Sequence, residues 1–345
     1  MSNLRILIPF VCLFALLSCS KKDDHNPCGI ELDDDLILTI QDEYTTLPAK
    51  VSVFFKVDDQ TGKPIPNLSS SDFTIYEKGR NDNCEKEISS FEANAKISNR
   101  KQIFSYNTVL VLDLSASVTA TSLDELKAAA QTFIEEVIPA DTDSSYYMGI
   151  WWFDGSDQLN QLIPVTADKV ALKNAVENIN ANISNDPSTD LYGAVIKSVD
   201  QAETLLGNAE QQNAISAVSV VIFTDGTDQA GRYLKNNAYS AVNSASNSIK
   251  IFSIGLGGEI DEDVLTRIGT DGFVFATDQT QLEETFREVG QVVSAEANSY
   301  YLFEYCSPKR DGSGRNKLRI LANSNGNIGS VVTEFDATGF TGGCQ

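Results

Sequence analysis

The sequence predicts an α/β protein built around a doubly wound, mostly parallel six-stranded sheet, with all-β segments before and after it in the chain. Between residues 101 and 298, apolar strands alternate with amphipathic helices, which is the pattern of such a sheet. One of these strands holds four consecutive apolar residues, Val109 to Leu112, as expected for a strand buried on both faces. Residues 31–100 and 299–345 show short strands separated by turns instead.

Residues 1–18 are predicted to be a signal peptide. Arg5 is followed by an apolar run from Ile6 to Leu17 that is too short to span a bilayer as a mature helix. The run ends in Leu16-Leu17-Ser18-Cys19, which resembles the lipobox of bacterial lipoproteins, where cleavage before the cysteine leaves it lipidated. The alternative is an ordinary secretory signal that is cut nearby.

Residues 19–30 are predicted to form a tether. Its start, Ser20-Lys21-Lys22-Asp23-Asp24, resembles the tag that directs some Gram-negative lipoproteins to the outer face of the outer membrane. This resemblance implies a lipid-anchored, surface-exposed protein of the bacterial outer membrane; a periplasm-facing protein on a plain tether is the alternative. A net charge of -22 argues against binding to nucleic acid or anionic headgroups, so the lipid is the only expected membrane contact.

Of the six cysteines, Cys12 leaves with the signal peptide and Cys19 takes the lipid. The even number that remains in an exported protein favours two disulfides. We predict that Cys28 pairs with Cys84 and that Cys306 pairs with Cys344, since each pair flanks one β segment. The alternative is a set of long-range pairs that join the two β segments.

The β segment of residues 31–100 begins with a strand in which Val51, Val53, Phe55 and Val57 alternate with other residues, so we expect it to be half-buried. A turn-rich stretch with one glycine and two prolines follows, and another strand starts at Phe73.

In the central region, Ser122-Leu123-Asp124-Glu125 is predicted to be a capping box that starts a helix ending near Val137. Helical apolar spacing predicts further helices around 172–179, 191–205 and 282–293. Apolar runs predict the strands 147–153, 159–165, 217–223, 249–256 and 272–276.

Three more strands are predicted after Ser299, at 300–305, 317–322 and 330–335. Three strands alone make a poor core. Either they complete a sandwich begun by residues 31–100, which makes the α/β region an insertion, or they form a separate module.

Oxygen-bearing side chains follow two of the buried strands. Asp113, Ser115 and Ser117 come directly after Val109–Leu112, and Asp225 follows the strand 217–223. Open α/β sheets bind ligands at the carboxyl ends of their strands, so these residues form a candidate site.

Residues 101–298 resemble a von Willebrand factor A domain, the fold of integrin I domains. Asp113-Leu114-Ser115-Ala116-Ser117 matches the D-x-S-x-S pattern of that family's metal-ion-dependent adhesion site, and Thr189 and Asp225 fall where the family has its other metal-site residues. The stretch before Thr189 lacks the glycines that are common there. Residues 62–79 resemble a small β-sandwich module that often precedes such a domain in bacterial surface proteins.

Hydroxyl and carboxylate oxygens make a site for a hard cation, Mg²⁺ or Mn²⁺, and a poor one for zinc. The resemblance implies that Ser115 and Ser117 bind the ion directly, that Thr189 binds it directly or through water, and that Asp113 and Asp225 hold coordinated waters. It also implies a protein ligand with an exposed carboxylate, or a glycan. Asp113, Ser115, Ser117, Thr189 and Asp225 could instead be hydrogen-bonding residues without a metal.

Two other functional classes stay open: a scaffold subunit of an envelope complex and a metal-dependent hydrolase. We expect no enzyme, because the motif neighbourhood offers no base besides the aspartates of the metal site. The only histidine, His25, lies in the tether, which excludes a Ser-His-Asp triad in the folded part. Trp151 and Trp152 point to opposite faces of a strand and are expected to pack rather than to stack on a ligand.

Overall fold

The computed structural model describes residues 35–89, 95–98, 104–140, 145–184, 186–212, 214–309 and 314–342, all within one compact unit, Leu32–Gln345. The predictions for the signal peptide, Cys19 and the tether lie outside these residues, as do Cys28 and Cys344. Within the described ranges, none of the helices has both the length and the apolar character needed to cross a bilayer.

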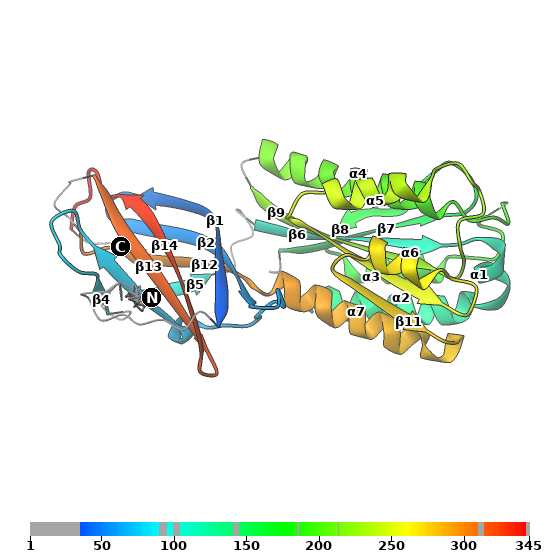
Figure 1. Cartoon of the computed structure of the whole chain (residues 1–345), viewed down its shortest axis with the longest axis horizontal. Helices are drawn as coiled ribbons and strands as arrows, with labels where there is room; N and C mark the ends of the chain where they lie inside the picture. Colours follow the sequence, from blue (N-terminus) through cyan, green and yellow to red (C-terminus); the bar gives the residue numbers. More distant parts are fainter. Residues whose placement is uncertain are drawn as a thin grey trace, which may run out of the picture. The chain divides into compact units, whose positions relative to one another are not determined.

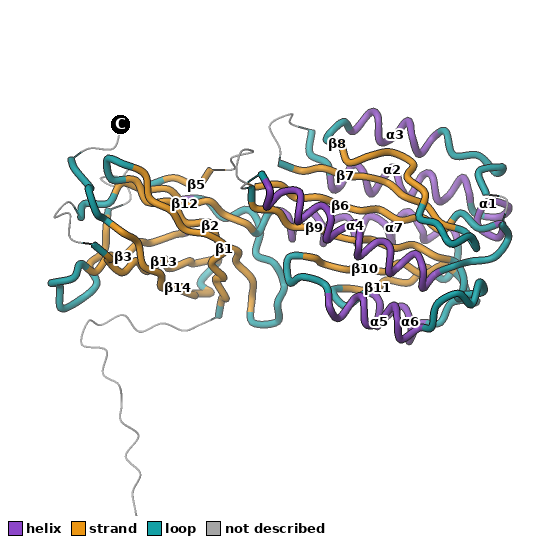
Figure 2. Tube along the Cα trace, turned by 90° about the horizontal axis from the view of Figure 1, so that it is seen from above, coloured by secondary structure: helices purple, strands orange, loops and turns teal. Residues whose placement is uncertain are grey.

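The central sheet has six strands in the order β11-β10-β9-β6-β7-β8, which Figure 2 shows side by side. All neighbours are parallel except β7 and β8. This confirms the predicted doubly wound, mostly parallel sheet. The strands are β6 Phe104–Asp113, β7 Tyr146–Phe153, β8 Asn160–Thr166, β9 Ile215–Thr224, β10 Ile249–Leu256 and β11 Gly272–Ala276.

Helices cover both faces of this sheet, and Figure 1 shows α4 and α7 on opposite sides of it. One core holds α2 Leu123–Val137, α3 Lys169–Glu177 and α7 Leu282–Ala297, with the short α1 Ala116–Thr121. The other holds α4 Leu191–Gln211, α5 Lys235–Ser244 and α6 Glu262–Ile268. Alternate residues of β6 enter the two cores, Leu110 and Leu112 the first, Val109 and Val111 the second. The apolar run Val109–Leu112 has no polar interruption because helices cover both faces of the sheet.

The predicted capping box is wrong. The Ser122 side chain makes no capping hydrogen bond. Its backbone N–H donates to the Val118 carbonyl, and its own carbonyl accepts from Leu126 N–H, so helical hydrogen bonding already runs through this position from α1. No free helix end needs a cap there, and the Ser122 hydroxyl instead accepts a hydrogen bond from Gln279.

The flanking strands form two four-stranded sheets that share one core, and each sheet draws on both ends of the chain. β12 pairs with β2, and β13 pairs with β3, so the C-terminal strands complete a sandwich into which the α/β region is inserted. Figure 1 shows the orange and red strands among the blue ones. The strands are β1 Leu36–Thr46, β2 Lys50–Asp59, β3 Phe73–Lys78, β4 Lys86–Ile88, β5 Lys96–Ser98, β12 Tyr300–Cys306, β13 Arg315–Ser324 and β14 Asn327–Asp336, with the 3-10 turns η1 Ser70–Asp72 and η2 Gln279–Gln281.

Strand β2 is buried on both faces, not half-buried as its alternation predicted. Val53 and Phe55 belong to the sandwich core. Phe54 points the other way and packs on Phe104, with 4.9 Å between the ring centroids, and on Tyr300. The alternation predicted only one buried face, but the second face of β2 is also covered, by Phe104 at the start of β6 and by Tyr300 at the start of β12.

Cys84 and Cys306 are both disulfide-bonded. Because Cys28 and Cys344 lie outside the described residues, the pairing of the four cysteines stays a prediction.

Candidate metal centre

Four of the five predicted site residues lie together at the carboxyl edge of the central sheet. Asp113 is the last residue of β6, Ser115 is the residue before α1, and Ser117 lies in the first turn of that helix. Asp225 follows directly after β9, the neighbour of β6. Because both strands are parallel, their ends meet at the same edge.

A chain of hydrogen bonds joins these four residues. The Ser115 backbone N–H donates to Asp113 Oδ1 over 3.0 Å, and the Ser115 and Ser117 hydroxyl oxygens are 3.2 Å apart. The Ser117 hydroxyl donates to Asp225 Oδ1 over 3.0 Å. Two hydroxyls therefore lie between two carboxylates.

Thr189 is buried beside the N-terminus of α4. Its carbonyl accepts hydrogen bonds from the backbone N–H groups of Gln229 (2.8 Å) and Ala230 (3.1 Å), in the segment that follows Asp225. The next residue, Asp190, donates its backbone N–H to the carbonyl of Asp154, which follows β7. Thr189 thus joins the loops at this edge, but among the described residues no hydrogen bond links its side chain to the other four site residues.

The two carboxylates have unusual electrostatic surroundings. Asp113 is fully buried, and burial raises its pKa to about 7, a shift that the Thr224 hydroxyl opposes and the nearby Asp225 increases. Burial also raises the pKa of Asp225, against the effect of the Ser117 hydroxyl, with a smaller contribution from Glu259. Neither aspartate forms an ion pair with any lysine or arginine in the described part of the chain. Within the described residues, the negative charge of the site is therefore not compensated by an ion pair.

This set of side chains fits a hard divalent cation. Hydroxyl and carboxylate oxygens are the ligands that Mg²⁺ and Mn²⁺ prefer, and a cation would supply the positive charge that the chain itself lacks here. Asp113, Ser115, Ser117 and Asp225 could hold such an ion, with Thr189 at the same edge of the sheet.

Thr224 is a site residue that the sequence reasoning missed. Its buried hydroxyl donates to Asp113 Oδ2 over 2.7 Å and accepts from the Gly226 backbone N–H over 3.2 Å. The pairing of Leu112 with Phe223 brings the next residues of the two strands, Asp113 and Thr224, side by side. Thr224 could have been identified as a site residue only from the register between β6 and β9, which a single sequence does not reveal.

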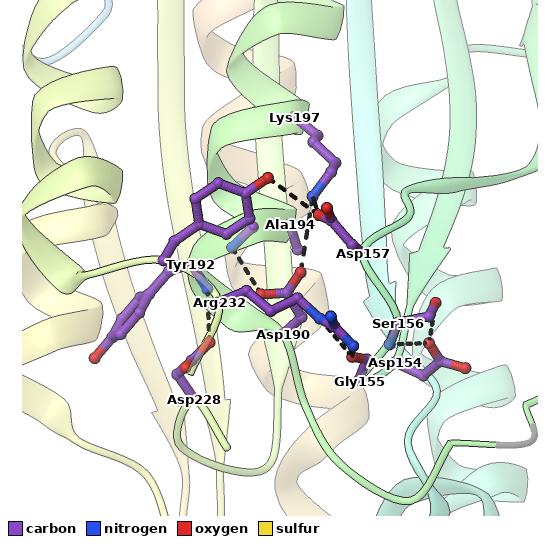
Figure 3. Close-up of polar contacts among 12 residues, drawn as sticks. Asp154, Gly155, Ser156, Asp157, Asp190, Tyr192, Ala194, Lys197, Asp228 and Arg232 are labelled. Carbon is purple, nitrogen blue, oxygen red and sulfur yellow. Dashed lines mark hydrogen bonds and ion pairs between the residues drawn. The ribbon is translucent and has the colours of Figure 1, made fainter. Parts of the chain in front are cut away.

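Hydrogen bonds also brace the loops around Asp190, the residue after Thr189, as Figure 3 shows. Arg232 donates twice to the Gly155 carbonyl, over 3.1 and 2.8 Å. Lys197 pairs with Asp157 over 2.6 Å and with Asp190 over 3.7 Å. These contacts tie the loop after β7 to α4 and to the segment that precedes α5, so the surroundings of Thr189 are fixed from several sides.

The fold and the site together define a class: a doubly wound α/β domain with hydroxyl and carboxylate oxygens gathered at the carboxyl edge of its sheet. Residues 107–288 match the model of the von Willebrand factor type A domain, and the chain belongs to this family. Such domains typically mediate protein–protein interaction with metal-dependent adhesion, and they are generally non-enzymatic.

Solved structures with a related fold include proximal thread matrix protein 1 from the mussel byssus, 15% identical with a TM-score of 0.45 over 56% of this chain and 49% of that one. This chain thus spans about half the length of the mussel protein. A von Willebrand factor type A protein from Catenulispora acidiphila is 12% identical, with a TM-score of 0.45 over 89% of this chain and 74% of that one. The manganese-loaded TRAP protein of Plasmodium vivax is 14% identical, with a TM-score of 0.44 over 71% and 97%.

Proposed function

We propose that this chain is a surface lipoprotein that binds a protein ligand through a divalent cation, Mg²⁺ or Mn²⁺, held by Asp113, Ser115, Ser117, Thr189 and Asp225. A glycan ligand bound in the same way is the alternative. The lipid on Cys19 would anchor the chain in the bacterial outer membrane, with the folded part facing outward. The cation serves binding, not catalysis.

The observation that carries this proposal is the hydrogen-bonded series from Asp113 through Ser115 and Ser117 to Asp225. Two hydroxyls lie between two carboxylates, these carboxylates have no cationic partner among the described residues, and Ser117 is exposed to solvent. Such an arrangement supports a cation that a ligand can reach from outside.

The proposed roles differ between the inner and outer residues of the site. Asp113 is fully buried and held by the Thr224 hydroxyl, so it would supply negative charge to a bound ion. Ser115 and Ser117 would contribute neutral hydroxyl oxygens from the start of α1. When bound, the cation supplies an open coordination position for a carboxylate of the partner.

The direct test is capture of surface-labelled proteins by the purified chain, in Mg²⁺ and in EDTA. We expect a partner that is retained in Mg²⁺ and released by EDTA, and that Ser117→Ala no longer captures. Ser240→Ala, which removes an exposed hydroxyl from α5, is the matched control and should bind like wild type. Capture that is unchanged in EDTA supports a scaffold subunit instead, and turnover of model phosphoesters supports a hydrolase.

The lipid anchor has its own test. We predict that mass spectrometry of the chain purified from bacterial membranes finds Cys19 as the mature N-terminus, carrying fatty acyl groups. Cys19→Ala should abolish the modification and release the chain from the membrane fraction, because a lipid chain gains about 0.8 kcal/mol per buried CH₂ group. An unlipidated N-terminus at another residue contradicts this part of the proposal and leaves the metal site untouched.

A further inference from the structure

An open pocket of about 490 Å³ lies beside the metal centre, at the ends of β7 and β8 and against the segment that leads to Thr189. Its volume is in the range of small-molecule sites. The proposed cation does not use it. Its lining combines the aromatic ring of Trp152 and the apolar Ile183 with polar side chains, those of Asp154, Ser156, Gln158, Asn160 and Asp186.

Trp152 provides a flat apolar wall. It is half-buried, packs partly against the core under α2 and α3, and lines the pocket as well. It lies on β7 opposite Asn160 of β8, in the antiparallel pair at the edge of the sheet. Because strand pairing and core contacts fix its backbone and part of its ring, Trp152 is a pre-positioned surface, which the sequence-based expectation of simple packing did not foresee.

Two carboxamides at the pocket have unused hydrogen-bonding capacity. The side chains of Gln158 and Asn160 make no hydrogen bond within the described residues, and both line the pocket. Each carboxamide offers two N–H donors and a carbonyl acceptor in one plane. Such groups match the adjacent hydroxyls of a sugar, each of which both donates and accepts.

The opposite side of the pocket is held rigidly. Asp154 accepts from the Ser156 backbone N–H and hydroxyl, over 2.8 and 2.6 Å, and from the Ser184 hydroxyl over 2.7 Å. Asp186 Oδ1 accepts from the backbone N–H and the hydroxyl of Ser188, over 3.0 and 2.7 Å. This side of the pocket therefore needs little ordering when a ligand enters, and ordering is a main cost of binding.

We propose that this pocket binds a neutral pyranose ring, as the terminal or penultimate sugar of a surface glycan. One face of a pyranose is rich in C–H groups and can lie on the Trp152 ring, while its hydroxyl rim meets the Gln158 and Asn160 amides. The carboxylates of Asp154 and Asp186, with no lysine or arginine among the described lining residues, disfavour acidic sugars. This inference goes beyond the proposed metal-dependent function and does not depend on it.

The test is saturation-transfer NMR of the full chain with a panel of methyl pyranosides, including neutral hexoses, N-acetylhexosamines and a uronic acid, recorded in EDTA. We expect at least one neutral pyranoside to bind with a dissociation constant on the order of millimolar, as weak single-sugar contacts give. The uronic acid should bind more weakly than its neutral counterpart.

The variants locate the binding. The double substitution Gln158→Ala with Asn160→Ala should weaken binding on the order of tenfold, because two sets of hydrogen bonds are lost. Gln161→Ala is the control, since this exposed neighbour on β8 does not line the pocket, and it should bind like wild type. Trp152→Ala should abolish binding, and Trp152→Phe, which keeps a ring and most of the packing, should retain part of it.

Two results would overturn the inference: no neutral pyranoside binding, or binding that the double variant leaves unchanged. Sugar binding that requires Mg²⁺ and disappears in Ser117→Ala would also overturn it, while supporting the proposed cation site. Conversely, sugar binding in EDTA with no cation-dependent partner would support the pocket and count against the proposed function.

Discussion

In EDTA, Asp113→Asn should unfold at the same temperature as wild type or slightly higher, and only the wild type should gain stability when Mg²⁺ is added. Asp113 is fully buried near a second carboxylate, Asp225, and its burial raises its pKa, so the charged form costs free energy without a cation. Asparagine keeps the shape and removes the charge. With Mg²⁺ at about 100 times its dissociation constant, the wild type should gain about 2.7 kcal/mol.

Thermal unfolding followed by circular dichroism, in EDTA and in millimolar Mg²⁺, measures both effects. Thr224→Val is a useful companion variant, because it keeps the side-chain volume but removes the hydroxyl that donates to Asp113 Oδ2. It should lose about 1–3 kcal/mol in EDTA, the cost of an unsatisfied buried group. If Asp113→Asn lowers the melting temperature equally in both conditions, Asp113 has a structural role and the proposed cation site is wrong.

Phe286→Ala should lower the free energy of unfolding by about 3–5 kcal/mol, the range for removal of a fully buried phenylalanine. Phe286 lies on α7 with no exposed surface. Its ring centroid is 5.5 Å from that of Phe223 and 6.2 Å from that of Phe133 on α2. Phe223 lies on β9 two residues before Asp225, so the cavity would open under the strand that leads to the metal centre.

Urea unfolding of Phe286→Ala and wild type gives this difference directly. Val292→Ala is the matched control on the same helix: its side chain is 44% exposed, so the change should stay within about 0.5 kcal/mol. Equal losses for the two variants would show that α7 is not packed on the sheet as described.

The elements that the sequence predicted best are those with a strong apolar pattern of known period. The run Val109–Leu112 predicted a strand covered on both faces because its residues must enter two cores, and α2 and α7 followed from their stripes. Two short helices were missed for different reasons: α5 buries only Ala238 and Val242, and α6 is only 7 residues long, which is too short for a helical period to show.

The candidate site was predictable as far as its residues follow strand ends in the sequence. Asp113 and Asp225 come directly at or after apolar runs, so their meeting at one edge followed from parallel strands. Thr224 could not be predicted, since its contact with Asp113 depends on the register between β6 and β9. The pocket beside Trp152 was missed for the same reason, because the register between β7 and β8 places Asn160 opposite Trp152.

Titration with Mn²⁺, followed by electron paramagnetic resonance of the unbound ion, tests the proposed cation site most directly. We predict one ion bound per chain in the wild type, and loss of that ion in both Asp113→Asn and Ser117→Ala, with Ser240→Ala as the control that still binds. Mg²⁺ should compete for the same position, since both ions prefer oxygen ligands. No bound ion in the wild type, or binding that survives both substitutions, would contradict a cation held by Asp113 and Ser117.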